Sequence, residues 1–147
     1  MGSSSFVGVE EVSCREAWAR LQAEPSAVLV DVRTQSEWAF VGLADLTEIG
    51  KQPVLVEWSS FPTSRTDPQF VDKLDAALRE LGVGRDDQVY FLCRSGGRSR
   101  MAAEAMTAAG YTRCCNVSEG FEGPLDERRH RGTRSGWKSA GLPWVQG

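Results

Sequence analysis

The sequence predicts an α/β fold in which a parallel sheet is covered by helices on both faces. The chain of 147 residues has an ordinary apolar fraction and is long enough for one domain with its own core. Short apolar runs rich in β-formers alternate with segments of helical periodicity. Such a β-α-β alternation is typical of parallel sheets, which are buried on both sides.

Capping signals and apolar runs define the elements of the first half. Two capping boxes, S-C-R-E and T-Q-S-E, predict helices over 13–21 and 34–40. The apolar run between these helices predicts a strand over 27–32, and another strand is expected over 53–57.

A structural helix is expected next. Asp67 and Pro68 predict an N-cap followed by proline in the first helical position. Apolar side chains then recur at helical spacing until Gly82, which predicts that the helix ends there.

The segment 88–99, Q-V-Y-F-L-C-R-S-G-G-R-S, is the most informative part of the chain. An apolar run predicts a buried strand over 88–92, and an Ala- and Met-rich segment predicts a helix over 98–109. Cys93 therefore lies in a strand-to-helix turn, where parallel sheets carry their reactive loops. A last strand over 112–117 completes the alternation.

The composition of this turn favours a reactive thiolate. Gly96 and Gly97 tolerate positive φ, so successive backbone N–H groups can curl toward the Cys93 sulfur. Arg94 and Arg98 add two permanent positive charges. We therefore expect Cys93 to ionise more readily than a free thiol, and the same cradle to hold an oxyanion or the outer sulfur of a persulfide.

Three parts of the chain resemble one known family. The loop 93–99, C-R-S-G-G-R-S, is similar to the active-site loop of rhodanese-domain sulfurtransferases. D-V-R at 31–33, followed by S-E-W at 36–38, resembles the family's D-V-R and E-aromatic segment. G-F at 120–121 and W-K-S-A-G-L-P at 137–143 resemble its ending. The chain departs from the family where many members have G-H-I, since it has V-G-L there, and it has Glu-Gly where paired glycines are usual.

The resemblance implies a fold and a function. The fold would be a single rhodanese-like domain over 6–147, after a flexible tail over 1–5, with a central, mainly parallel five-stranded sheet and helices on both faces. The function would be a thiosulfate sulfurtransferase. A sulfane sulfur would pass from thiosulfate or a related donor to cyanide, a thiol or a protein through a persulfide on Cys93. The alternative is a rhodanese-like carrier or sensor of low turnover that feeds a partner protein.

The expected site centres on Cys93 as the catalytic residue. The loop residues expected to bind substrate are Arg94, Ser95, Gly96, Gly97, Arg98 and Ser99. Arg94 is assigned to the sulfonate of the donor, and Arg98 to stabilising the thiolate and the loop. The residues expected to support the site are Asp31, Arg33, Trp38 and Trp58.

Each supporting residue also has a structural interpretation. For Asp31 and Arg33 an internal ion pair, for instance Arg33 with Glu37, is favoured over a place at the site. One of the two tryptophans, Trp38 or Trp58, is expected at the rim of the substrate pocket and the other in the core.

A phosphatase or arsenate reductase is the rival cysteine chemistry. Those enzymes have a C-x5-R loop, whereas Arg98 lies five positions after Cys93, so the loop here is one residue shorter. A shorter loop makes a smaller cradle, which suits a sulfur atom better than a tetrahedral phosphate. The sequence has no histidine near the loop to act as a base, and sulfur transfer to a thiolate needs none.

The sequence argues against a metal or cofactor site and against nucleic-acid or membrane binding. Cys14, Cys114 and Cys115 are expected to be buried structural cysteines, although one of the latter two could face the site. His130 is the lone histidine, so no metal is expected, and no cofactor. The net charge of −3 and the short apolar runs argue against a nucleic-acid or membrane partner. The first residues lack the features of a signal peptide, so a reducing cytoplasm is expected, and the oligomeric state is open.

Overall fold

The computed structural model describes residues 8–59, 65–132 and 135–146, and these contain a five-stranded parallel sheet. The strand order is β2-β7-β6-β3-β5, and every neighbouring pair is parallel. The strands are β2 (Glu10–Val12), β3 (Val28–Asp31), β5 (Val54–Leu55), β6 (Val89–Leu92) and β7 (Cys114–Val117). The predicted parallel sheet is therefore confirmed, and the tail expected over 1–5 lies outside the described residues.

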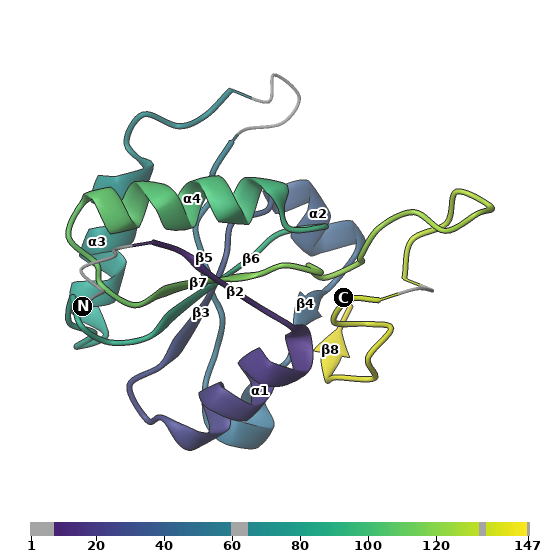
Figure 1. Ribbon diagram of the computed structural model, residues 1–147, viewed down its shortest axis with the longest axis horizontal. Coiled ribbons are helices and arrows are strands. Elements are labelled where there is room, and N and C mark those ends of the chain that lie inside the picture. Colours follow the sequence, from purple (N-terminus) through teal and green to yellow (C-terminus); the bar gives the residue numbers. More distant parts are fainter. Residues whose placement is uncertain (1–7, 60–64, 133–134, 147) are drawn as a thin grey trace.

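Helices cover both faces of the sheet, as predicted (Figure 1). They are α1 (Cys14–Ala23), α2 (Gln35–Phe40), α3 (Phe70–Glu80) and α4 (Gly97–Ala108), with a 3-10 turn η1 (Thr47–Ile49). One apolar cluster joins α1 to one face of the sheet, and a second cluster joins α3 and α4 to the other. None of the helices in the described part of the chain is long and apolar enough to cross a membrane.

The N-termini of α2 and α3 test the capping signals read from the sequence. At α2 the capping box is complete, because Thr34 accepts from the backbone N–H of Glu37 and the Glu37 side chain accepts from that of Thr34. At α3 the prediction is wrong by two residues, since the N-cap is Gln69 and not Asp67. The Asp67 side chain accepts from the backbone N–H of Gln69 at 2.8 Å, which forms a turn before the helix instead of its first turn.

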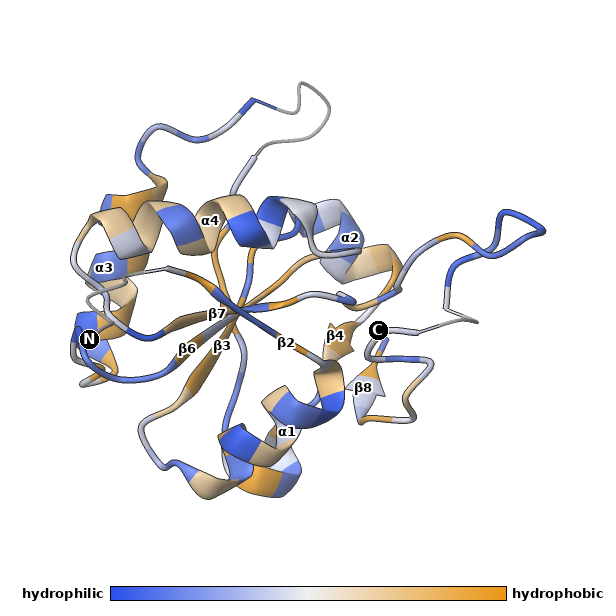
Figure 2. Cartoon of the chain, in the orientation of Figure 1, coloured by the Kyte–Doolittle hydropathy of each residue, from blue (hydrophilic) through white to orange (hydrophobic). Residues whose placement is uncertain are grey.

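Besides β2 and η1, two features were not predicted. A short antiparallel pair joins β4 (Leu43–Ala44) to β8 (Trp144–Val145), near the end of the chain. Between β7 and β8, the segment 124–132 forms an arm that projects from the body of the domain and is hydrophilic at its tip (Figures 1 and 2). The arm begins just beyond the carboxyl end of β7, on the side where the candidate site lies.

Candidate active site

The sulfur of Cys93 sits at the carboxyl end of the central strand β6, as expected, and is almost sealed from solvent. Its residue is 1% exposed. Two groups lie within hydrogen-bond distance of the sulfur: the backbone N–H of Gly96 donates to it at 3.2 Å, and the Ser99 hydroxyl oxygen lies 3.2 Å away. The sulfur therefore faces the first residues of α4, whose N-cap is Gly96.

The loop keeps this shape because it is clamped against the chain that leaves β7. The carbonyl of Cys93 accepts from the backbone N–H of Phe121 at 2.8 Å, and that of Arg94 accepts from two further N–H groups at 3.0 and 3.1 Å. Gly96 and Gly120 both have positive φ, and a Cβ at either would collide with backbone of the other segment. These two glycines allow the close approach that fixes the sulfur.

Asn116 on β7 lies at the site and was not predicted from the sequence. Its side-chain oxygen lies 2.5 Å from the Ser99 hydroxyl, and its side-chain nitrogen donates to the Gly96 carbonyl at 3.1 Å and to Glu11 at 2.9 Å. The available signal was a polar amide in a four-residue strand whose side chains are all buried. A buried amide in such a place has partners to satisfy.

Arg98 lines the site but faces a carboxylate. Its guanidinium donates to both oxygens of Glu37, at 2.7 and 2.9 Å. Burial raises the pKa of Glu37, but the hydrogen bonds from Arg98 and Thr34 and the Arg98 charge outweigh burial and lower it to about 2. The hydrogen bonds to Glu37 also raise the pKa of Arg98. The charge of Arg98 is therefore largely balanced by Glu37.

Asp31 and Arg33 form the internal ion pair that was favoured for them, with a different partner from the one suggested. Arg33 donates to Asp31 at 2.7 Å, while Glu37 binds Arg98. Arg33 also donates to the Gly42 carbonyl at 2.8 Å and stacks over the ring of Phe121 at 4.4 Å. Both members of the pair are buried, so they tie the end of β3 to the chain around it.

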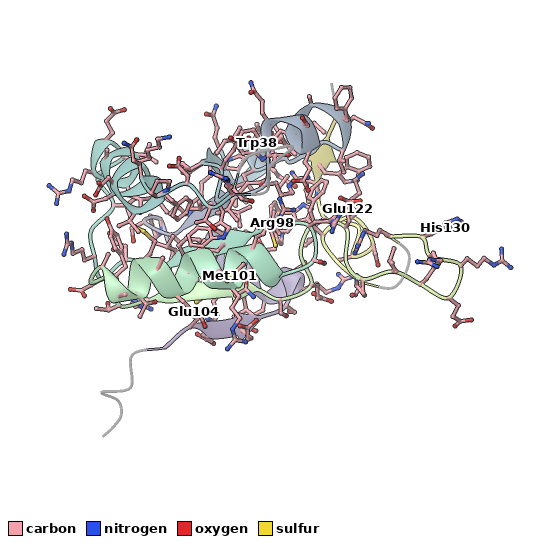
Figure 3. All side chains as sticks on the ribbon, turned by 90° about the horizontal axis from the view of Figure 1, so that it is seen from above. Trp38, Arg98, Met101, Glu104, Glu122 and His130 are labelled. Carbon is pink, nitrogen blue, oxygen red and sulfur yellow. The ribbon has the colours of Figure 1, made fainter. Side chains whose placement is uncertain are left out.

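A cavity of about 770 Å³ opens beside the loop. It is lined by Thr34, Ser36, Glu37, Phe40, Val41, Trp58, Ser59, Thr66, Arg94, Arg98, Met101, Glu122 and Arg131. Trp58 is thus the tryptophan at the site, although it also packs against Phe70 at 5.0 Å, and Trp38 lines a separate hollow. Figure 3 shows Arg98 and Met101 on one helix and Glu122 at the root of the arm, with His130 far out along it.

The other three cysteines, Cys14, Cys114 and Cys115, are buried, as expected. Burial raises the pKa of Cys14, whose thiol donates to the Gly120 carbonyl at 3.4 Å. Burial also raises the pKa of Cys114 to about 11 and that of Cys115 to about 12. Within the described ranges, no group of His, Cys, Asp or Glu side chains is arranged to hold a metal ion.

Residues 8–147 match the family described as the STR4 middle domain. The chain belongs to this rhodanese-like family. The rhodanese-like domain is 35% identical over 136 residues to an uncharacterized protein, RP600, of Rickettsia prowazekii, covering 92% of this chain and 97% of that protein. It is 31% identical over 144 residues to the chloroplastic protein Thylakoid Rhodanese-like of Oryza sativa, covering 98% of this chain and 26% of that longer protein.

Solved structures agree on the rhodanese-like fold. The crystal structure of Rv0390 from M. tuberculosis matches with a TM-score of 0.82 and 44% identity, over 95% of this chain and 99% of that one. A polysulfide-sulfur transferase homodimer from Wolinella succinogenes matches with a TM-score of 0.60 over 95% of this chain and 80% of that one. At 22% identity, the second likeness concerns the fold alone.

Proposed function

We propose that this rhodanese-like domain is a sulfurtransferase that carries a sulfane sulfur on Cys93. The observation that supports it best is that the Cys93 sulfur accepts the Gly96 N–H at the start of α4, in a loop whose Arg94 lines the neighbouring cavity. A helix N-terminus and a nearby cation favour negative charge on sulfur and on an incoming anion. Sulfur transfer needs both a negatively charged sulfur and a bound anionic donor.

The reaction proceeds by double displacement. The Cys93 thiolate attacks the outer sulfur of thiosulfate, a sulfur–sulfur bond forms to Cys93, and the sulfur–sulfur bond of the donor breaks with its electron pair leaving on sulfite. In the second step, cyanide or a thiolate attacks the outer sulfur of the persulfide and Cys93 leaves as thiolate. Charge and atoms balance in each step, and once Cys93 is ionised neither step requires a proton transfer.

The two loop arginines have different parts. Arg94 is exposed and lines the cavity, and within the described chain no ion pair engages it, so it is available to bind the sulfonate of the donor. Arg98 is held by Glu37 and stabilises the loop. That pairing also disfavours phosphatase chemistry, in which the loop arginine must be free to clamp a phosphoryl group.

A carrier that feeds a protein partner is the second candidate. The cavity volume of about 770 Å³ falls in the range of about 300–1,000 Å³ that suits a drug-sized ligand, which is far more room than a small inorganic anion needs. Phe40, at its rim, is 78% exposed. An acceptor larger than cyanide, such as a thiol on another protein, fits this mouth, and a reducing cytoplasm would keep such a thiol available.

Intact mass of the reduced protein tests the proposal. We expect brief exposure to thiosulfate to add one sulfur, which cyanide then removes. Cys93→Ser should gain none, whereas Cys115→Ala, which removes a buried thiol on the same sheet, should gain it normally. Repeated turnover with cyanide supports the enzyme; loading that stops at one sulfur and is not released to cyanide supports the carrier. Sulfur gained by Cys93→Ser refutes both.

A further inference from the structure

The Ser99 hydroxyl lies within hydrogen-bond distance of two atoms that can each accept its single proton. One is the Cys93 sulfur at 3.2 Å and the other is the side-chain oxygen of Asn116 at 2.5 Å. A hydroxyl donates one hydrogen bond at a time, although it can accept others. Which atom receives the proton decides how the sulfur is held.

The orientation of the Asn116 amide is fixed by its other partners. Its nitrogen lies 3.1 Å from the Gly96 carbonyl and 2.9 Å from the Glu11 carboxylate, and both of those groups can only accept. The amide nitrogen must face them, so the amide oxygen must face Ser99. That oxygen has no proton of its own, and therefore the short contact requires the proton of Ser99.

This arrangement suits a neutral thiol at Cys93. With the Ser99 proton directed at Asn116, the 3.2 Å contact is satisfied when the Cys93 S–H donates to the Ser99 oxygen. If Cys93 ionises, its sulfur keeps the Gly96 N–H as a donor and gains a second one when the Ser99 hydroxyl turns toward it, and the buried oxygen of Asn116 then loses its donor. A buried acceptor without a donor is unfavourable.

We propose that Asn116 is a positioning residue that withholds the Ser99 proton from Cys93 and so keeps the resting sulfur as a thiol. Ionisation of Cys93, in which the S–H proton is released to solvent, is coupled to breaking the bond between Ser99 and Asn116. The loop amide promotes the thiolate while the β7 side chain opposes it. This inference deepens the proposed function, on which it rests for its consequence: sulfur transfer would begin only when the Ser99 hydroxyl turns.

Several of the charged groups around Cys93 are paired with one another. On the elements packed against it, Arg98 binds Glu37, and Arg33 binds Asp31. Behind Asn116, Glu11 is 3.2 Å from Arg100. At the mouth of the cavity lie Arg94, Glu122 and Arg131. The pKa of Glu37, at about 2, keeps it charged throughout the neutral range.

Alkylation of Cys93 with iodoacetamide, followed by mass spectrometry across a pH series, tests this without any sulfur donor. Asn116→Leu replaces the amide with an apolar group of similar shape. The Gly96 carbonyl still accepts from the backbone N–H of Arg100, at 3.2 Å. We expect the pH of half-maximal alkylation to fall by about one unit, which is a tenfold gain in rate below that pH. Asn116→Leu in a Ser99→Ala background should produce no further shift.

The proposal is overturned if the pH of half-maximal alkylation stays the same or rises in Asn116→Leu. It is also overturned if Asn116→Leu lowers that pH equally in the wild-type and the Ser99→Ala backgrounds. A second measurement uses the wild type: the carbon signal of the Asn116 amide should titrate together with Cys93. A signal that stays constant through that titration is also contradictory. Alkylation depends on the reactivity of the Cys93 sulfur and not on sulfur transfer. A protein that fails to transfer sulfur would therefore still give a decisive result here.

Discussion

Replacing Glu37 with Gln tests the ion pair that joins α2 to the start of α4. Gln keeps the shape of the side chain and an oxygen that can accept from the backbone N–H of Thr34, so the capping box survives. It lacks the negative charge that holds both nitrogens of the Arg98 guanidinium. The variant therefore removes charge from a half-buried contact and changes little else.

The size of the effect follows from the pKa of Glu37. This pKa lies at about 2 instead of 4.5, a lowering that corresponds to ~3 kcal/mol because each pKa unit is worth about 1.4 kcal/mol. The Thr34 bonds supply part of it and survive in the variant. The side chains of Arg98 and Glu37 are 24% and 20% exposed, so solvent screens part of the rest. We expect Glu37→Gln to lower the free energy of unfolding at pH 7 by about 2 kcal/mol.

The effect should depend on pH in one direction. A carboxylate whose pKa is lowered on folding stabilises the fold above the unfolded value, near 4.5 for Glu37, and the contribution is lost as the pH falls toward about 2. The wild type and the variant should therefore differ fully at pH 7 and converge near pH 2.

Urea denaturation at pH 7 and at intervals down to pH 2.5 measures this difference. Glu104→Gln is the matched control, since Glu104 also pairs with an arginine on α4, at 3.4 Å, but is 55% exposed. It should cost less than ~0.5 kcal/mol. A Glu37→Gln penalty no larger than that of the control, or one that is the same at pH 7 and pH 2.5, would refute the reasoning.

Two further variants probe the loop. Arg94→Ala should raise the KM for thiosulfate about five- to tenfold with little change in kcat, because a charge-assisted contact in the cavity is lost; Arg128→Ala, on the arm, should leave KM unchanged, and equal effects would mean that only a general field acts. Gly120→Ala should destabilise the fold by more than ~3 kcal/mol, because the backbone there has a φ of +74° and the added Cβ would also collide with the Arg94 carbonyl. Gly132→Ala has φ +84° and open space, so a cost of only ~1–2 kcal/mol is expected; similar unfolding midpoints for the two would contradict the close approach.

Local sequence signals predicted most of the parallel sheet. The apolar runs over 27–32 and 88–92 became β3 and β6, because each is long enough to cross a buried sheet and lies between clear turn signals. The strands β2 and β8 are different, since their three and two residues carry little periodicity. Each exists because of a distant partner: Glu10 pairs with Cys115, and Val145 with Leu43.

The same division holds for the candidate site. Cys93 and its loop could be identified because a strand, two glycines and a helix follow one another within twelve residues. The partner of Arg98 could not, because Glu37 lies 61 residues away along the chain and was suggested as a partner of Arg33 instead. Asn116 was missed for a similar reason: its importance comes from contacts with Ser99 and Glu11, which only the folded sheet brings together.

The clamp on the reactive loop has a consequence for the order of folding. The carbonyls of Cys93 and Arg94 are held by N–H groups from Phe121 to Gly123, so the loop closes only after α4 and β7 have docked and the chain beyond them has returned to the sheet. Closing a long segment is entropically costly and tends to come late. In a chain where β7 and the segment beyond it have not docked, this clamp on the loop is missing. If Cys93 is the sulfur carrier that we propose, loading of sulfur on it therefore reports that the loop and the chain beyond β7 are both in place.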